Sequence, residues 1–366
     1  MRAVLIEAFG APPALTRTPD PSCPPDGVIV AVEATGLCRS DWHGWMGHDD
    51  DISLPHIPGH ELAGTVVEIG PQVTAWHVGD RVTTPFVLAC GRCRSCSRGD
   101  AQVCEDQRQP GFTQWGSFAE LVALPRADLN LVRVPDEVPT EVAASLGCRF
   151  ATAYRAVTHV GRVQAGETVV VHGCGGVGLS AVMVAVALGA RVLALDPDPA
   201  SLALAEQLGA ISVGSADPGD ALADLTDGGA EVSIDAYGDR RNLALAVASL
   251  RPRGRHVQVG LLSGDDAHPP VDMGRVLAQE LQLLGSHGMP ASDYPELPAR
   301  VADGILDPAR LIRERIGLAH AGARLAALGE PGAGAGGMTM IRPDLTRQLA
   351  GSGTRGAQEA HEVQGT

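Results

Sequence analysis

An α/β fold in two units is expected for this chain of 366 residues: an irregular β-rich region followed by a doubly wound parallel sheet. The first part of the sequence is interrupted by Gly and Pro and carries only short β-like runs, which indicates long loops on a β framework. From about residue 150, apolar runs alternate with helical segments, which is typical of a parallel sheet covered by helices on both faces.

The individual elements follow from these patterns. Strands of the β-rich region are expected at Gly27–Val32, Gly64–Ile69 and Asp80–Thr83. Strands of the parallel sheet are expected at Thr168–His172, Arg191–Asp196, Ile211–Val213, Val232–Asp235, His256–Val259 and Leu281–Leu284. Helices are expected at Gly176–Leu188 and Pro199–Leu208, and another after about residue 290 should end at Leu306, before short runs up to Ile341.

Composition excludes several chemistries and partners. All 28 basic residues are arginine, so no lysine is present to bind phosphate in a Walker motif, to form a Schiff base or to act as a base. The formal net charge of −15 disfavours binding to nucleic acid or to an anionic membrane. No apolar run is long enough to be a signal peptide or a membrane span, so we expect a cytoplasmic protein.

Four cysteines lie within one short segment of the β-rich region: Cys90, Cys93, Cys96 and Cys104. Four thiolates at this spacing can surround one tetrahedral Zn²⁺ and leave no coordination position open, so this zinc would be structural. Two disulfides or a zinc ribbon that binds nucleic acid would use the same residues. An acidic chain in a reducing compartment favours structural zinc.

A second group of candidate metal ligands is spread over the sequence. It consists of Cys38, the adjacent pair His60 and Glu61, and Cys148. Two thiolates and one imidazole form a zinc site whose fourth position can take water or substrate, which is the arrangement of catalytic zinc. Each residue alone is ambiguous, because a buried cysteine is usually a small hydrophobic side chain.

A glycine-rich segment lies between an expected strand and an expected helix, in the context that a dinucleotide-binding fingerprint requires. Cofactor contacts are expected from Gly173, Gly175, Gly176, Val177 and Gly178. The glycines let the backbone approach a pyrophosphate at a helix N-terminus. Asp196, at the end of the next strand, should accept both ribose hydroxyls and repel a 2′-phosphate, which favours NAD over NADP. A tight turn without ligand is the alternative.

The segment Gly59-His60-Glu61-Leu62-Ala63-Gly64, with Gly70 and Val73, resembles the signature of zinc-dependent alcohol dehydrogenases in the medium-chain dehydrogenase/reductase superfamily. The resemblance continues through Cys38-Arg39-Ser40, the four-cysteine loop, Gly79-Asp80-Arg81-Val82 and Gly147-Cys148-Arg149-Phe150, over about residues 1 to 342. It implies a GroES-like catalytic domain at 1–149 and 290–342 and a Rossmann domain at 150–289. The polar segment 343–366 is expected to be a disordered tail.

The resemblance also implies a mechanism with two zinc ions per chain. In the family, the equivalents of Cys38, His60 and Cys148 hold the catalytic zinc, and the equivalent of Glu61 lies behind the metal and can bind it transiently. The metal binds the alcohol oxygen and lowers its pKa, and hydride then passes from the alkoxide carbon to the nicotinamide. Family members usually form homodimers or homotetramers.

Residues after Cys38 are expected to move the proton. Ser40 and His43 match the family's proton relay, and Arg39 matches a position that contacts the cofactor pyrophosphate. Asp41 is a candidate partner for the second N–H of a zinc-bound imidazole, because such ligands usually donate to a carboxylate. In the alternative interpretation, Ser40 caps a helix, and His43 and Arg39 are surface residues.

Aromatic residues near the metal motifs suggest the substrate. Trp42, Phe86 and Trp115 suit an apolar or aromatic primary or secondary alcohol better than a sugar, unless they only fill the core. A polyol dehydrogenase is disfavoured because that branch typically lacks the cysteine at position 148, whereas a threonine-type dehydrogenase stays open. A non-catalytic zinc or thiol redox sensor is the alternative of a different class.

Overall fold

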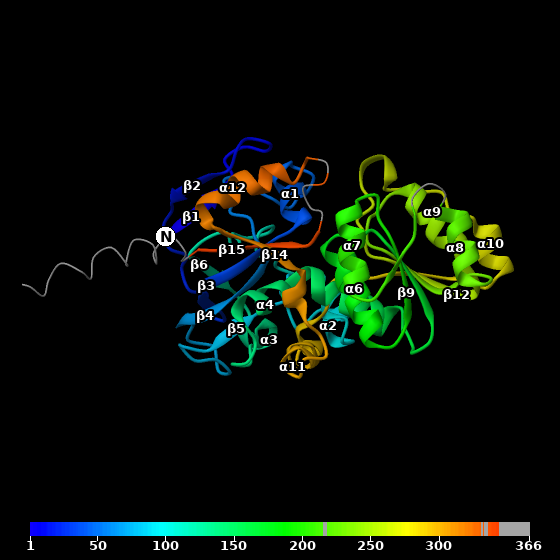
Figure 1. The fold of residues 1–366 in the computed structure, drawn as a ribbon. Helices are drawn as coiled ribbons and strands as arrows, with labels where there is room; N and C mark the ends of the chain where they lie inside the picture. The colour runs from blue at the N-terminus through cyan, green and yellow to red at the C-terminus, as the bar shows by residue number, and fades with distance from the viewer. Residues whose placement is uncertain (215–217, 331, 333–335, 344–366) are drawn as a thin grey trace, which may run out of the picture.

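The computed structural model describes residues 1–214, 218–330, 332 and 336–343, which form two units side by side (Figure 1). One unit is built on a mixed sheet and the other on a parallel sheet with helices on both faces. The expected α/β fold is confirmed. Apart from Pro343, the expected tail at 343–366 lies outside the described residues.

Six parallel strands form the sheet of the second unit, in the order β10-β9-β8-β11-β12-β13. They are β8 (Thr168–His172), β9 (Arg191–Leu195), β10 (Ile211–Ser212), β11 (Ala230–Asp235), β12 (Leu250–Gln258) and β13 (Gln282–Gly285). The sequence predicted all six, although β12 begins earlier than expected. Because the order reverses between β8 and β11, the carboxyl ends of these strands border a crevice of the kind in which doubly wound sheets bind ligands.

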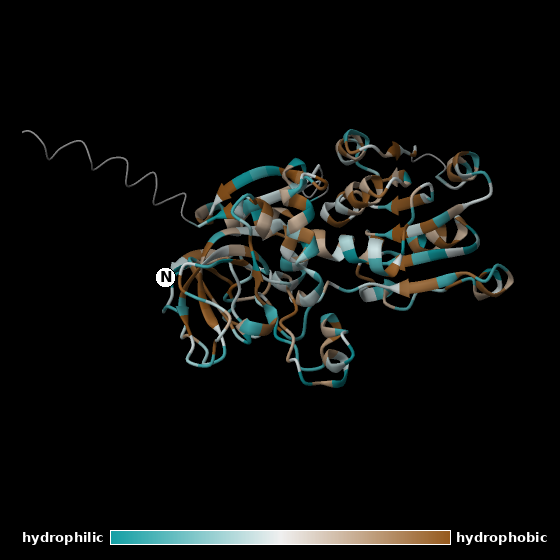
Figure 2. Cartoon of the chain, turned by 90° about the horizontal axis from the view of Figure 1, so that it is seen from below, coloured by the Kyte–Doolittle hydropathy of each residue, from teal (hydrophilic) through white to brown (hydrophobic). Residues whose placement is uncertain are grey.

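Helices cover both faces of this sheet: α6 (Gly176–Ala187), α7 (Pro199–Gln207), α8 (Pro218–Thr226), α9 (Arg240–Ala248) and α10 (Met273–Ala278). Successive residues of β8 point to opposite faces, as a strand requires. Val169 and Val171 pack in the core under α6 and α7, while Val170 packs under α8 and α9. Both faces of β8 are therefore buried, which explains its continuous apolar run, and Figure 2 shows brown stretches on strands of this sheet.

The first unit is built on seven strands, in the order β14-β15-β3-β4-β5-β7 with β6 also beside β3. They are β3 (Val28–Leu37), β4 (Glu61–Ile69), β5 (Arg81–Thr83), β6 (Leu121–Leu124), β7 (Val132–Arg133), β14 (Ile312–Gly317) and β15 (Met338–Arg342). A hairpin of β1 (Arg2–Leu5) and β2 (Ala14–Arg17) lies beside it. Strand β3 pairs antiparallel with β15, β4 and β6, so the end of the chain completes a sheet begun near its start.

Short helices surround the mixed sheet, namely α1 (Arg39–Trp45), α2 (Arg94–Ser97), α3 (Ala127–Asn130), α4 (Thr140–Ser145), α11 (Glu296–Ala302) and α12 (Leu318–Ala327), while α5 (Ala151–Arg155) packs against α6. π-helical turns at Leu146–Phe150 and Ala156–Val160 flank α5. The helix expected to end at Leu306 is the shorter α11. Helix α12 was not predicted; it buries Leu318, Ala321 and Leu325 against β1 and β3.

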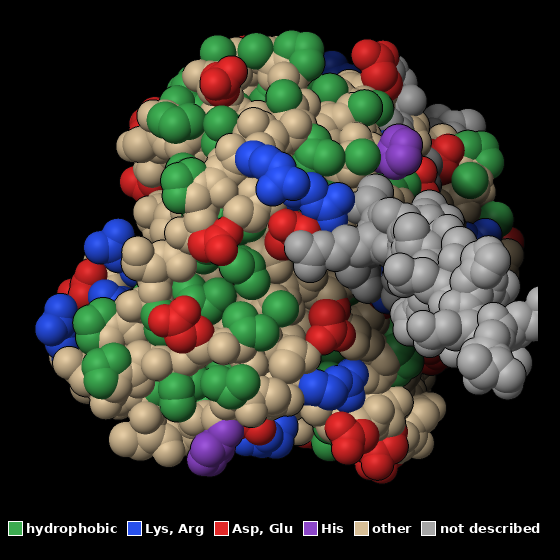
Figure 3. Space-filling view, turned by 90° about the vertical axis from the view of Figure 1, so that its left-hand side faces the viewer, with side chains coloured by type: hydrophobic (Ala, Val, Ile, Leu, Met, Phe, Trp, Pro, Cys, Tyr) green, Lys and Arg blue, Asp and Glu red, His purple; other side chains and the backbone are tan. Residues whose placement is uncertain are grey.

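The hydrophobic core continues between the units. Phe150 and Tyr154 pack in one cluster with Leu179 of α6 and with Leu297 of α11. On the face of the mixed-sheet unit in Figure 3, acidic and arginine side chains are interspersed with hydrophobic ones. Among the described residues, no helix is both long and apolar enough to cross a membrane.

Candidate metal and dinucleotide sites

The first candidate metal ligand lies where β3 ends and α1 begins. Cys38 is the N-terminal capping residue of α1, and its backbone N–H donates to Asp41 Oδ2 at 2.9 Å. Its sulfur lies 3.8 Å from Ser40 Oγ. The start of one short helix therefore brings together the thiol, the hydroxyl and the carboxylate that the sequence singled out.

Asp41 is buried and orients His60. Its Oδ1 accepts the Gly59 N–H at 3.0 Å and lies 2.9 Å from His60 Nδ1. Because the carboxylate accepts, Nδ1 carries the hydrogen and Nε2 is directed elsewhere. Nε2 is buried without a hydrogen-bond partner in the described part of the chain. Burial alone would lower the pKa of His60, but the charge and hydrogen bond of Asp41 outweigh it and raise the pKa well above its usual value.

Four ligand atoms, one each from Cys38, His60, Glu61 and Cys148, lie within 4.8 Å of one another. Hydrogen bonding between the two thiols lowers the pKa of Cys38 well below its usual value and raises that of Cys148 well above it. Cysteine binds a divalent cation as the thiolate, so metal binding here would release protons. Two sulfurs and an imidazole are a soft donor set that suits zinc.

Glu61 is held by a buried ion pair with Arg149 that no sequence pattern indicated. Arg149 Nε donates to both carboxylate oxygens at 2.9 and 3.1 Å, and its backbone N–H donates to Oε1 at 2.9 Å. The side chains are 8% and 0% exposed. Burial raises the pKa of Glu61, and the charge of Arg149 opposes this rise. Both carboxylate oxygens of Glu61 therefore have a hydrogen-bond donor in Arg149.

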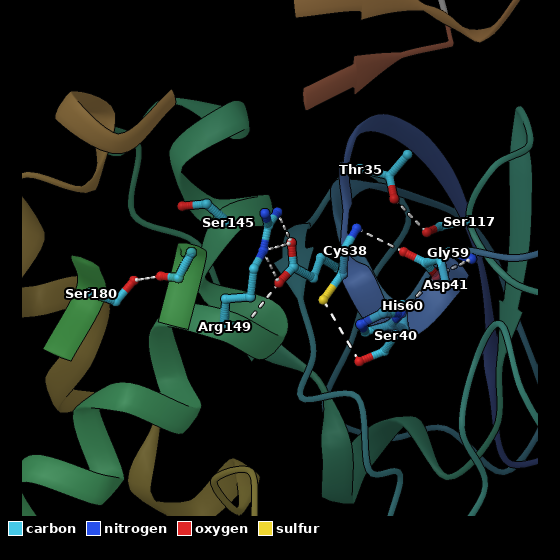
Figure 4. A network of polar contacts seen from close by, with 12 residues as sticks. Thr35, Cys38, Ser40, Asp41, Gly59, His60, Ser117, Ser145, Arg149 and Ser180 are labelled. Atoms are coloured by element: carbon cyan, nitrogen blue, oxygen red, sulfur yellow. Dashed lines mark hydrogen bonds and ion pairs between the residues drawn. The ribbon is translucent and has the colours of Figure 1, made fainter. Parts of the chain in front are cut away.

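Arg149 also contacts the glycine-rich segment. A Cβ atom at Gly176, the first residue of α6, would lie 2.5 Å from Arg149 Cδ. The Ser180 hydroxyl donates to the Gly176 carbonyl at 2.6 Å. Figure 4 shows Arg149 between the helix that carries Ser180 and the group around Cys38. One side chain thus connects the metal-ligand cluster to the candidate cofactor loop.

The glycine-rich segment forms the turn from β8 into α6. Gly173 has a φ of +88°, which favours glycine, and a Cβ at Gly178 would lie 1.7 Å from the Gly173 carbonyl oxygen. No atom lies within 4 Å of a Cβ built at Gly175. Asp196 follows β9 beside this turn, where its oxygens accept the backbone N–H groups of Cys174 at 2.6 Å and Asp198 at 2.8 Å.

The two expected relay residues lie on α1, and both are half-buried. His43 Nδ1 is 3.1 Å from Nδ1 of His48, an exposed residue that the sequence analysis did not single out. Both imidazoles meet the Trp42 ring edge to face. Burial, followed by the charges of Arg39 and His48, lowers the pKa of His43 and keeps its ring neutral.

Arg39 makes its contacts within the mixed-sheet unit. Its guanidinium donates to the Leu328 carbonyl and lies 4.6 Å from the centre of the Trp42 ring. The structure therefore groups Arg39 with α12 and not with the turn after β8.

Aromatic rings lie beside His60, but they are not all the rings that the sequence predicted for the substrate pocket. Phe86 lies 6.3 Å from the His60 ring, and Phe112, which the sequence did not indicate, lies 5.3 Å from it. The structure places Trp115 outside this group. Its indole N–H donates to the Pro55 carbonyl at 3.1 Å, and its ring lines a separate cavity with residues such as Met1. This placement gives Trp115 no contact with the candidate substrate-binding rings.

The four clustered cysteines meet as the spacing predicted. The sulfurs of Cys90, Cys93, Cys96 and Cys104 lie within 4.8 Å of one another. All eight cysteines of the chain are described, and none forms a disulfide. Backbone donors, chiefly the Cys96 N–H, lower the pKa of Cys93 to about 6. This set has the closed donor geometry of a structural zinc site.

Both units of the chain are similar to known dehydrogenases. A family described as "Alcohol dehydrogenase GroES-like domain" matches residues 24–136, and one described as "Zinc-binding dehydrogenase" matches residues 176–303. An alcohol dehydrogenase of Geobacillus stearothermophilus is 33% identical over 310 residues, which cover 83% of this chain and 90% of the relative. An L-threonine 3-dehydrogenase of Sinorhizobium medicae is 32% identical over 314 residues, covering 83% and 88%. The solved structure of alcohol dehydrogenase TADH from Thermus sp. ATN1 has a TM-score of 0.86 and 30% identity, with 93% and 99% covered.

Proposed function

The chain belongs to the zinc-dependent alcohol dehydrogenase family of the medium-chain dehydrogenase/reductase superfamily, and on that premise we propose that it transfers hydride between a small primary or secondary alcohol and NAD. The unpartnered, buried Nε2 of His60 beside two cysteine sulfurs carries this proposal. A buried polar nitrogen costs free energy unless it is bound, and a metal ion is the partner that suits this donor set.

We assign Cys38, His60 and Cys148 as ligands of a catalytic zinc, with Glu61 behind it, and the four clustered cysteines as ligands of a structural zinc. A zinc at the first site supplies a Lewis acid for the alcohol oxygen. Asp41 fixes the tautomer of His60 so that Nε2 is available. Because Glu61 is paired with Arg149, the metal would be held by Cys38, His60 and Cys148, and it would keep a position for substrate.

The chain's own residues would move the proton. Ser40, beside the Cys38 sulfur, would accept the proton of the alcohol hydroxyl as its own hydroxyl proton passes toward His43. His43 has a lowered pKa, so it is neutral near pH 7 and can accept that proton, and its contact with exposed His48 leads toward solvent. Phe86 and Phe112 would give the carbon skeleton an apolar surface.

We also propose the division into a catalytic domain at 1–149 and 290–342 and a cofactor domain at 150–289, which the pairing of β15 with β3 supports. The proposed assembly is a homodimer or homotetramer, and the proposed location is the cytoplasm.

Replacing Asp196 by Ala should weaken NADH binding about 10- to 100-fold, because two hydrogen bonds to a charged acceptor are lost. The preference for NAD over NADP should narrow as well, since the carboxylate that repels a 2′-phosphate is removed, but it should not reverse, because the residues after Asp196 provide no cation for that phosphate. Fluorescence titrations with NADH and with NADPH measure both effects, and zinc content should not change. An unchanged affinity would remove Asp196 from the ribose site.

The function is tested by NAD and NADP reduction on primary, secondary and benzylic alcohols, with L-threonine and sorbitol as further substrates. We expect turnover of monohydric alcohols with NAD, lost in Cys38→Ser. Turnover restricted to L-threonine would replace the proposed substrate by an amino acid. Absence of turnover with every substrate, in zinc-loaded protein, would contradict the proposal.

A further inference from the structure

A histidine beside the Phe86 ring lies outside the machinery assigned above. His287 follows β13, and its ring meets Phe86 edge to face, with centroids 5.1 Å apart and an interplanar angle of 82°. Phe86 meets His60 in the same manner at 6.3 Å and 78°. One phenyl ring thus contacts both imidazoles, whose centroids therefore lie no more than about 11.4 Å apart.

The backbone fixes His287 against Phe86. Gly288 has a φ of +56°, and a Cβ atom at this position would lie 2.9 Å from Phe86 Cε1. Only glycine lets the main chain approach the ring so closely. The place of His287 relative to Phe86 is therefore set by the chain path.

The tautomer of His287 follows from its one hydrogen bond. Nδ1 lies 3.1 Å from the Gln102 carbonyl oxygen, which can only accept, so Nδ1 carries the hydrogen. In the neutral ring Nε2 is then an acceptor, and it has no hydrogen-bond partner among the described residues. The ring is exposed, so a small molecule can reach it.

The four-cysteine loop supports this arrangement. Gln102 belongs to the 3₁₀ turn Ala101–Val103, directly before Cys104. Phe86 packs against the buried cluster of the same loop, which consists of Val87, Ala89 and Cys104. Both the aromatic ring and the anchor of His287 are thus attached to the candidate structural zinc site.

We propose that His287 binds a hydrogen-bond donor, a hydroxyl or an ammonium, on the end of the substrate remote from the metal. The inference rests on the proposed alcohol dehydrogenase function and narrows its substrate class to short-chain diols and amino alcohols. A carboxylate at the same position has no hydrogen to donate to Nε2, so hydroxy acids gain nothing from this contact.

Matched substrates test the proposal. Ethanol, n-propanol and n-butanol are each compared with the alcohol that carries a second hydroxyl, an amino group or a carboxylate on the terminal carbon. For at least one chain length, kcat/KM of the diol or amino alcohol should exceed that of the monohydric alcohol by about fivefold or more. This factor corresponds to the net contribution of one hydrogen bond. His287→Leu should abolish this preference while changing the monohydric alcohol by less than about twofold.

Two further variants separate recognition from support of the fold. His287→Gln keeps an acceptor and should restore part of the preference. His77→Leu, at a side chain that is 82% exposed, should leave it unchanged. Equal losses on monohydric and dihydric substrates, or a preference that survives in His287→Leu, would overturn the proposal. So would a parent enzyme without any preference.

Calorimetric binding of the same alcohols to the zinc-loaded protein with NADH gives a readout that does not depend on turnover. If no alcohol is oxidised, the proposed function fails, but tighter binding of the diol than of the monohydric alcohol, lost in His287→Leu, would still support His287 as the recognition residue. Equal binding of the two alcohols would overturn it.

Discussion

Arg149→Met should lower the free energy of unfolding by about 3–5 kcal/mol, because it leaves the Glu61 carboxylate buried without its countercharge. The loss should exceed that of an ordinary hydrogen bond, since the guanidinium of Arg149 donates to both carboxylate oxygens of Glu61, whereas the backbone N–H bond to Glu61 remains in the variant. Urea unfolding at matched zinc content measures the effect.

Lowering the pH should reduce the loss of stability caused by Arg149→Met. Burial already raises the pKa of Glu61, and removing Arg149 takes away the charge that opposes the rise. The folded variant therefore holds a proton on Glu61 at a pH where the unfolded chain has released it, so its stability falls as pH rises and recovers on acidification.

Two controls accompany Arg149→Met. The double variant with Glu61→Gln should recover part of the lost stability, because no buried charge is left without a partner. Arg253→Met breaks a pair whose side chains are 83% and 77% exposed, and should cost less than about 1 kcal/mol. A cost for Arg149→Met no larger than that of Arg253→Met would contradict the buried-pair account.

Gly178→Ala should destabilise the protein by about 1–3 kcal/mol through overpacking. The new Cβ would lie 1.7 Å from the Gly173 carbonyl oxygen, so α6 must move away from the end of β8. Because the cofactor loop joins these two elements, NADH affinity should fall at least about tenfold. Thermal unfolding and NADH fluorescence titration measure the two losses.

Gly175→Ala is the matched control within the same turn. Its φ is −75°, and no atom lies within 4 Å of the added carbon, so the unfolding free energy should stay within about 0.5 kcal/mol of the parent. NADH affinity should nevertheless fall, because the added methyl group occupies space that the pyrophosphate would approach. Unchanged affinity in both variants would contradict the placement of the cofactor at this turn.

Continuous apolar runs made the parallel sheet predictable. Both faces of β8 are buried, so its apolar run indicates a strand even when the neighbouring strands are not known. The same reasoning found only the end of β12, because its first part contains Arg251, Pro252 and Arg253. Helix α12 was missed since glycine and alanine interrupt its apolar face, and it is stabilised mainly by packing on β1.

In the candidate site, local motifs were predictable and long-range partners were not. Cys38, Ser40 and Asp41 share one helical turn, so their proximity follows from the sequence. Arg149 meets Glu61 across 88 positions and His287 meets Gln102 across 185, and no periodicity links such residues. Apart from being aromatic, Phe112 has no sequence feature that indicates its position beside His60. Trp115 is aromatic as well, but it lies at a separate cavity.

Zinc content per chain, measured for the parent and for Cys38→Ser, tests the two-centre assignment most directly. The two ligand clusters predict two zinc ions per chain in the parent. In Cys38→Ser they predict one retained zinc and no alcohol oxidation, because the four-cysteine cluster is untouched. A parent that oxidises alcohols with a single zinc, or a Cys38→Ser variant that keeps both ions and full activity, would contradict the catalytic metal assignment.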